Sequence, residues 1–103
     1  MYAFVAGNRS GFVLKHVRVK VKGIVQGVGF RYFSRSLAFR YGIAGFVRNL
    51  PDGSVEIEAS GSAGDVDYFL KDISRGPSSS SVSGIDVEDI KDGCCNNGFE
   101  IRF

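Results

Sequence analysis

Residues 16–22 constrain the fold most, because their side chains alternate strictly between apolar and polar types. Valines stand at positions 17, 19 and 21, and the other positions hold His16, Arg18, Lys20 and Lys22. A period of two is that of a β-strand with one buried face and one face in water. We therefore expect a strand that covers a hydrophobic core, with His16 on the solvent-facing side and in no catalytic role.

A glycine-rich stretch follows and leads into a helix. Residues 23–31 read GIVQGVGFR. From Phe30 onward, mostly apolar residues recur at helical spacing, which predicts a stripe that faces the core. Gly42 suits the C-terminus of this helix. The stripe consists of Phe30, Phe33, Ser34, Leu37, Ala38 and Tyr41.

Residues 43–103 continue the alternation of strand and helix patterns. Residues 43–49 and a run with Val55, Ile57 and Ala59 predict a hairpin, joined by a type I turn over Leu50-Pro51-Asp52-Gly53. Val66, Phe69, Leu70 and Ile73 mark a second amphipathic helix, which Gly76-Pro77 ends. Residues 82–90 predict a fourth strand with a bulge near Gly84, and residues 99–103 a short last strand.

The element order βαββαβ predicts an α+β fold, the ferredoxin-like α/β sandwich. In this fold an antiparallel sheet carries two helices on one face. The other face, which includes Arg18 and Lys20, can stay in water. Many functions share this topology, so the fold alone assigns none.

The composition describes one small globular domain. The chain has 103 residues, 44% hydrophobic residues and a net charge of +2, so its bulk charge demands no polyanionic partner. It contains no apolar run long enough to span a membrane and no signal-peptide pattern. We expect a cytoplasmic monomer with an N-terminal extension, residues 1–15, and a domain at residues 16–103.

Cys94 and Cys95 do not form a disulfide framework, because adjacent cysteines cannot join distant segments. Two free thiols in a reducing cytosol, a strained vicinal bridge and an intermolecular disulfide remain as alternatives. One histidine and two adjacent cysteines do not supply the separated ligand pairs of a zinc site. We expect no metal and no cofactor.

The glycine loop indicates an anion site. No Ser, Thr, Asp or Asn stands between Gln26 and Gly29 to cap the helix, so its first N–H groups lack a partner. These amides and the positive end of the helix dipole favour an anion. The positive charge of Arg31 is unfavourable beside that end of the helix, and Arg35, four residues later, repels it. A bound phosphate would offset both effects. The alternative is a tight connection in which Arg31 is a solvated surface charge.

Two separated motifs carry a family resemblance. Residues 23–31, GIVQGVGFR, and residues 42–61, GIAGFVRNLPDGSVEIEASG, closely resemble acylphosphatase, a small hydrolase of carboxyl–phosphate anhydrides. The similarity continues through Gly76-Pro77 to residues 99–101 and covers about residues 17–103. The chain departs from the pattern in its N-terminal extension, at Leu50 and Ser80, and at residues 94–97.

The resemblance implies metal-free hydrolysis of a small-molecule acyl phosphate to a carboxylate and inorganic phosphate. It assigns Arg31 to hold the phosphate and Asn49 to position the attacking water. We expect neither nucleic acid nor a membrane as a partner. The loop positions that would bind the phosphate are Gln26, Gly27, Val28, Gly29, Phe30 and Arg31.

Asn49 suits this role on chemical grounds, because its carboxamide can accept from a water while it donates elsewhere. The alternative is that Asn49 only caps the following turn, where Asn is common. Arg35, Arg40 and Arg48 are secondary candidates for steering a phosphate, or else solvated charges.

Two other function classes compete with an enzyme. One is a non-catalytic phosphate-binding regulatory domain, because acylphosphatase-like domains also begin larger hydrogenase maturation proteins that handle carbamoyl phosphate. The other is a single-strand nucleic-acid binder of similar topology. The first strand shows no aromatic pair on its wet face, and the RNA-recognition signature is absent, which disfavours the second class.

Overall fold

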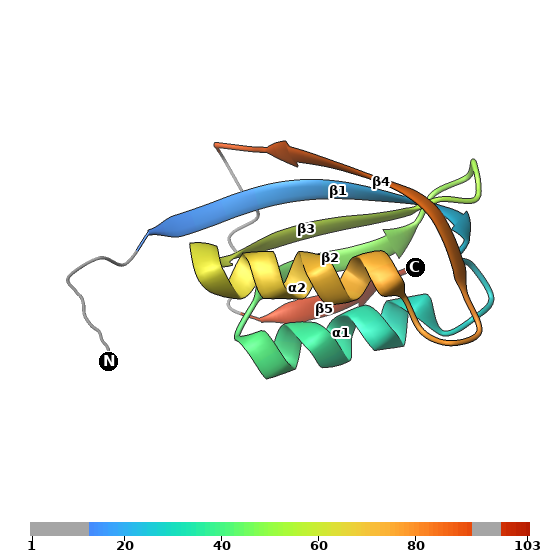
Figure 1. The fold of residues 1–103 in the computed structure, drawn as a ribbon, viewed down its shortest axis with the longest axis horizontal. Helices are drawn as coiled ribbons and strands as arrows, with labels where there is room; N and C mark the ends of the chain where they lie inside the picture. Colours follow the sequence, from blue (N-terminus) through green and yellow to red (C-terminus); the bar gives the residue numbers. More distant parts are fainter. Residues whose placement is uncertain (1–12, 92–97) are drawn as a thin grey trace.

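The computed structural model describes residues 13–91 and 98–103, which form a five-stranded sheet with two helices on one face (Figure 1). The predicted order of strands and helices is confirmed. Both helices begin and end within three residues of their sequence markers. The elements are β1 Leu14–Ile24, α1 Phe30–Tyr41, β2 Ala44–Asn49, β3 Val55–Ser62, α2 Ala63–Arg75, β4 Ser81–Asp89 and β5 Phe99–Arg102.

The strand order is β4-β1-β3-β2-β5. The prediction of an antiparallel sheet holds for β1 to β4, but β5 lies parallel to β2 and makes the whole sheet mixed. The register explains this direction. Asp89 at the end of β4 and Ala44 at the start of β2 lie at the same end of the sheet. A chain that leaves β4 there therefore enters the opposite edge running alongside β2.

The predicted bulge in β4 is confirmed. Lys22 pairs with Gly84, but the next residue, Gly23, pairs with Val82. Ser83 is therefore the extra residue that a β-bulge inserts into one strand.

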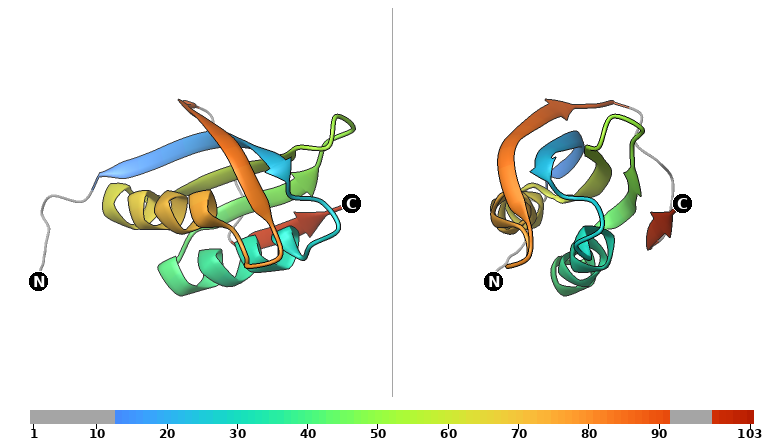
Figure 2. Two further views of the ribbon diagram at one scale, coloured as in Figure 1. Left: turned by 45° about the vertical axis from the view of Figure 1, so that its right-hand side comes forward. Right: turned by 90° about the vertical axis from the view of Figure 1, so that its right-hand side faces the viewer.

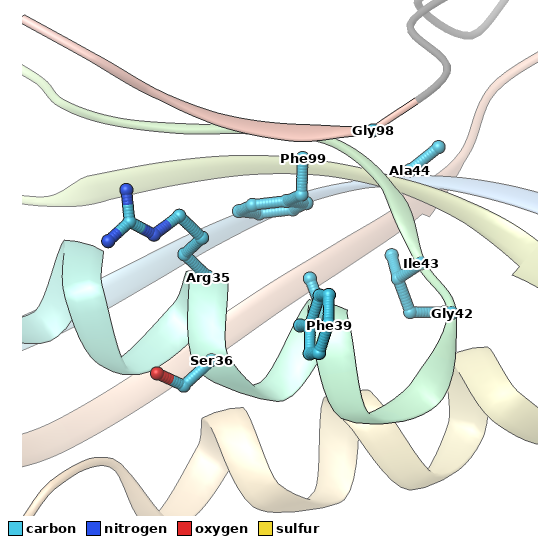
Figure 3. Close-up of a pocket in the computed structure, with 9 residues that line it drawn as sticks. Arg35, Ser36, Phe39, Gly42, Ile43, Ala44, Gly98 and Phe99 are labelled. Carbon is cyan, nitrogen blue, oxygen red and sulfur yellow. The ribbon is translucent and has the colours of Figure 1, made fainter.

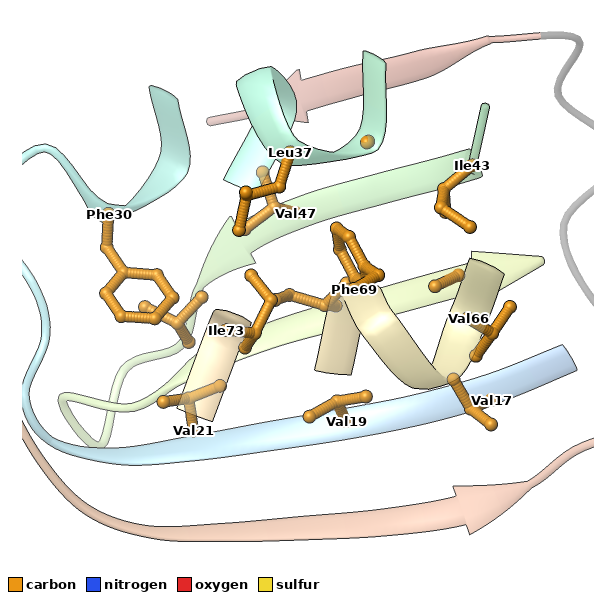
Figure 4. Packing of buried hydrophobic residues seen from close by; sticks show 14 of the residues in the cluster. Val17, Val19, Val21, Phe30, Leu37, Ile43, Val47, Val66, Phe69 and Ile73 are labelled. Atoms are coloured by element: carbon orange, nitrogen blue, oxygen red, sulfur yellow. The ribbon is translucent and has the colours of Figure 1, made fainter. Parts of the chain in front are cut away.

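The hydrophobic core lies between the sheet and the helices (Figure 4). The alternating valines of β1 are fully buried, as their period of two predicts. One apolar stripe from each helix covers them, which is how a helix buries its amphipathic face. The side chains labelled in Figure 4 are Val17, Val19, Val21, Phe30, Leu37, Ile43, Val47, Val66, Phe69 and Ile73.

The helix-free face carries ion pairs between neighbouring strands, which confirms its predicted polar character. Arg18 contacts both Glu58 on β3, at 3.3 Å, and Glu88 on β4, at 3.4 Å. His16 lies half-buried on this side of β1, and its Nδ1 has no hydrogen-bond partner among the described residues. Full exposure is not available to it because β1 is an inner strand with neighbours on both sides.

Four segments that are distant in sequence gather at one end of the molecule (Figure 2). They are the loop between β1 and α1, the turn between β2 and β3, the connection between α2 and β4, and the C-terminal residue. This end contains the glycine loop of the first motif and the turn at the centre of the second motif.

Candidate active site

The loop between β1 and α1 is fixed by a buried side chain on each side. Val25 is 1% exposed and Phe30 is 2% exposed, and both belong to the core. Between them, Gly27 and Gly29 adopt left-handed conformations with φ of 75° and 79°. A Cβ at either glycine would be strained by that φ, although it would meet no atom within 4 Å. The two glycines therefore give the loop its shape and leave its outer side open.

Helix α1 begins without a side-chain cap. Its N-cap is Gly29, no side chain accepts from its first amides, and its first turn holds no acidic residue. Among the residues that the structure describes, the backbone amides of residues 26–31 donate to no carbonyl or side chain. Helix α2 is capped in the usual way, since the Asp65 amide donates to Ser62 Oγ. The start of α1 therefore offers unpaired donors at the positive end of a helix dipole, an arrangement that binds anions.

Arg31 lies in the first turn of α1, half-buried. Its guanidinium carbon lies 4.5 Å from the ring centroid of Phe103, which is itself 94% exposed. Among residues 13–91 and 98–103, no carboxylate forms an ion pair with Arg31. The aromatic contact orients the guanidinium through a cation–π interaction and leaves its charge uncompensated.

Asn49 is the last residue of β2 and lies on the same face of the strand as buried Val47, two residues earlier. Its carboxamide hydrogen-bonds to no other described residue. The following turn is closed by other groups. The Gly53 amide donates to the Leu50 carbonyl at 3.1 Å, and the Ser54 amide donates to Asp52 Oδ1 at 2.9 Å. Asn49 thus lacks the hydrogen bond that a purely turn-capping role requires.

Gln26 connects the loop with this turn. Its side-chain Nε2 donates to the carbonyl oxygens of Leu50, at 2.8 Å, and Ser54, at 2.9 Å. From the sequence, we expected only the backbone amide of Gln26 to take part in the site. The hydrogen bonds of its side chain were not predicted. The one available signal was a long polar side chain directly after buried Val25.

The loop is also held from a third segment. Ser79, in the connection between α2 and β4, donates through its Oγ to the Val28 carbonyl at 2.9 Å. The loop, the turn and this connection therefore form one hydrogen-bonded assembly around the start of α1.

The three secondary arginines lie in other environments. Arg35 lines a cavity of about 660 Å³ between α1 and β5, beside Phe39 and Phe99 (Figure 3). Arg40 lies in the last turn of α1, and Arg48 on β2 pairs with Glu56 at 2.7 Å. These positions match solvated or paired charges. Cys94 and Cys95 lie outside the described residues, as do residues 1–12 of the predicted N-terminal extension.

Comparison with known proteins identifies the family. The family model for acylphosphatase matches residues 17–101. The chain belongs to the acylphosphatase family. The acylphosphatase of Oceanobacillus iheyensis is 42% identical over 87% of this chain and all of the relative. That of Chlorobaculum tepidum is 49% identical over 75% of this chain and 84% of the relative. The protein is accordingly an enzyme of this family.

Solved acylphosphatase structures share the fold. The crystal structure of acylphosphatase from Bacillus subtilis is 36% identical, has a TM-score of 0.83 and aligns with 88% of this chain and all of that one. A structure of full-length HypF in its phosphate- and nucleotide-bound form is 28% identical with a TM-score of 0.78. That match covers 89% of this chain but 12% of HypF.

In the described part of this chain, neither helix is long and apolar enough to cross a membrane.

The turn that follows Asn49 contains an acidic group with a shifted pKa. Lys20 Nζ lies 2.8 Å from Asp52 Oδ2 and donates to it, and the hydroxyl and amide of Ser54 also donate to Asp52. Together these contacts hold the pKa of Asp52 well below its usual range, with Lys20 as the largest cause.

Because its folded-state pKa is lowered, ionised Asp52 should stabilise the fold above about pH 4 and lose this effect as acid protonates it. We expect Asp52→Asn to lower the urea midpoint near neutral pH and to change it much less near about pH 2. In a Lys20→Met background the pH-dependent part should shrink. If Asp52→Asn lowered the urea midpoint by the same amount at both pH values, the lowered pKa of Asp52 would be contradicted.

Proposed function

We propose that the protein hydrolyses acyl phosphates to a carboxylate and inorganic phosphate. The backbone amides of residues 26–31 and the guanidinium of Arg31 bind the phosphoryl group, and Asn49 positions the attacking water. No metal or cofactor takes part. The substrate is a small molecule, and the protein acts as a cytoplasmic monomer without a nucleic-acid or membrane partner.

The observation that carries this proposal is the combination of unpaired amides and an uncompensated arginine at one helix start. An arginine beside the positive end of a helix is unfavourable by a few tenths of a kcal/mol. No carboxylate among the described residues pairs with it, although eight other ion pairs form among these residues. A bound phosphate would satisfy the amides and neutralise the arginine together, since guanidinium groups hold two phosphate oxygens at once.

The chemistry asks for positioning more than for acid–base groups. The water oxygen bonds to phosphorus, the bond from phosphorus to the carboxyl oxygen breaks, and its electron pair leaves on the carboxylate. Because a carboxylate is a stable leaving group, it needs no proton from the enzyme, and the proton of the water passes to phosphate or solvent. Phosphoryl transfer of this kind relies on orientation and electrostatic stabilisation. A carboxamide cannot act as a strong base, so Asn49 would orient the water by accepting from it.

The competing functions have weaker support. A regulatory phosphate-binding domain is suggested by the likeness to HypF, but the curated acylphosphatases are 42% and 49% identical and match in length. A nucleic-acid binder needs open aromatic platforms. Phe46 on the helix-free face is covered by the guanidinium groups of Arg48 and Arg102, at 6.0 and 4.0 Å from its ring centroid.

Arg31→Gln should lower kcat/KM for benzoyl phosphate by about 10³-fold or more, because it removes the positive charge that stabilises the phosphoryl group in the transition state. It should also weaken competitive inhibition by inorganic phosphate. The assay contains excess chelator, and wild-type turnover should be unchanged by it. Arg35→Gln is the matched control, one helical turn away, and should stay within about threefold of wild type. Full activity in folded Arg31→Gln would refute the proposed phosphate site.

Asn49→Ala should lower kcat by about 10²-fold while the inhibition constant of inorganic phosphate changes less than about threefold. The reason is that Asn49 contacts the water and not the phosphate. Steady-state kinetics with benzoyl phosphate and phosphate titration measure the two quantities. If Asn49→Ala instead lost phosphate affinity and kept its kcat, the division of roles between Arg31 and Asn49 would be wrong.

A further inference from the structure

The side chain of Gln26 uses both of its N–H groups on one turn. Nε2 donates to the Leu50 carbonyl at 2.8 Å and to the Ser54 carbonyl at 2.9 Å. A glutamine amide has two N–H donors, so both are satisfied. Both partners are carbonyl oxygens, which accept and cannot donate, so the nitrogen end of the amide must face the turn.

These two carbonyls form the neck of the turn that follows Asn49. The Leu50 amide donates to the Ser54 carbonyl at 2.9 Å, and the Gly53 amide donates to the Leu50 carbonyl at 3.1 Å. Gln26 therefore binds where the two strands of the hairpin separate. The Leu50 amide belongs to the peptide unit that follows Asn49, and it donates to the Ser54 carbonyl that Gln26 also holds. Gln26 therefore restrains the backbone directly after Asn49 through this shared carbonyl.

Within the described part of the chain, these are the hydrogen bonds that connect residues 26–29 to residues 50–54. Lys20 reaches the same turn at Asp52, but from the sheet, and Ser79 holds the loop from the connection between α2 and β4. The spacing between the loop amides and Asn49 thus depends on Gln26 directly.

We propose that Gln26 is a positioning residue, whose side chain sets the distance between the phosphate-binding loop and the water-orienting carboxamide of Asn49. This inference rests on the proposed function. It adds that Gln26 acts through Asn49 rather than on the phosphate. A displacement of about 1 Å between catalytic groups can lower a rate by about 10²-fold.

Gln26→Met tests this role, because methionine keeps the length of the side chain and removes both donors. We expect kcat for benzoyl phosphate to fall by about 10- to 100-fold, with the inhibition constant of inorganic phosphate within about threefold of wild type. Tyr41→Phe is the matched control. It removes one hydrogen bond between elements, from Tyr41 to Asp72 at 2.6 Å, far from the loop. It should keep wild-type kcat while lowering the urea midpoint.

A double-mutant cycle with Asn49→Ala distinguishes positioning from a merely structural role. It measures whether the effect of Gln26→Met on kcat depends on the presence of Asn49. If Gln26 acts through Asn49, Gln26→Met should lower kcat by less than about threefold in the Asn49→Ala background. Effects that multiply, or a parallel loss of kcat and phosphate affinity, would overturn the positioning role. Gln26→Asn, which is too short to reach both carbonyls, replaces Gln26→Met in the cycle if the latter does not fold.

The single variants separate this inference from the proposed function. If Asn49→Ala loses kcat and folded Gln26→Met does not, the role of Gln26 is wrong and the proposed function stands. If Asn49→Ala keeps its kcat, water positioning by Asn49 is wrong, and the role of Gln26 falls with it.

Discussion

The burial of Val25 and Phe30 is the constraint on which the site depends. Burying one such side chain contributes about 1.5–3 kcal/mol, whereas a missing N-cap costs about 1 kcal/mol. Core packing therefore outweighs capping at this position, and α1 can begin with its amides unpaired. The four residues between the two buried anchors reverse the chain only because Gly27 and Gly29 accept positive φ. The same packing that stabilises the fold thus presents the amides at the surface.

The second requirement is that groups distant in sequence reach this loop in a fixed arrangement. The direction of β2 brings Asn49 to the end of the sheet where α1 begins, and the parallel pairing of β5 with β2 brings Phe103 to the same end (Figure 1). Local contacts then fix the details. Gln26 holds the turn and Phe103 packs on Arg31. A small α+β domain can in this way orient a phosphate-binding arginine and a carboxamide with few specialised residues.

The sequence predicted what local periodicity encodes. The alternating valines of β1, the stripe of α1, the helix end at Gly42 and the extra residue near Gly84 are all observed. The sequence did not predict the parallel placement of β5, because strand direction at a sheet edge depends on where β4 ends and not on the pattern of residues 99–103. The side-chain hydrogen bonds of Gln26 were not predicted for a related reason. Their acceptors are backbone carbonyls, which every residue has, so the sequence does not show which of them Gln26 will meet. The half-buried state of His16 likewise reflects its two neighbouring strands.

The measurement that tests the central claim most directly is a titration of the ¹⁵N-labelled protein with inorganic phosphate, followed by amide NMR. If the uncapped start of α1 binds phosphate, the largest shifts should fall on the amides of residues 26–31 and on the side-chain Nε of Arg31. Those shifts should disappear in Arg31→Gln, while the amides of capped helix α2 stay unchanged. Shifts that centre on the lysines of the helix-free face, or a loop that does not respond to phosphate, would contradict the claim that this helix start is the phosphate site.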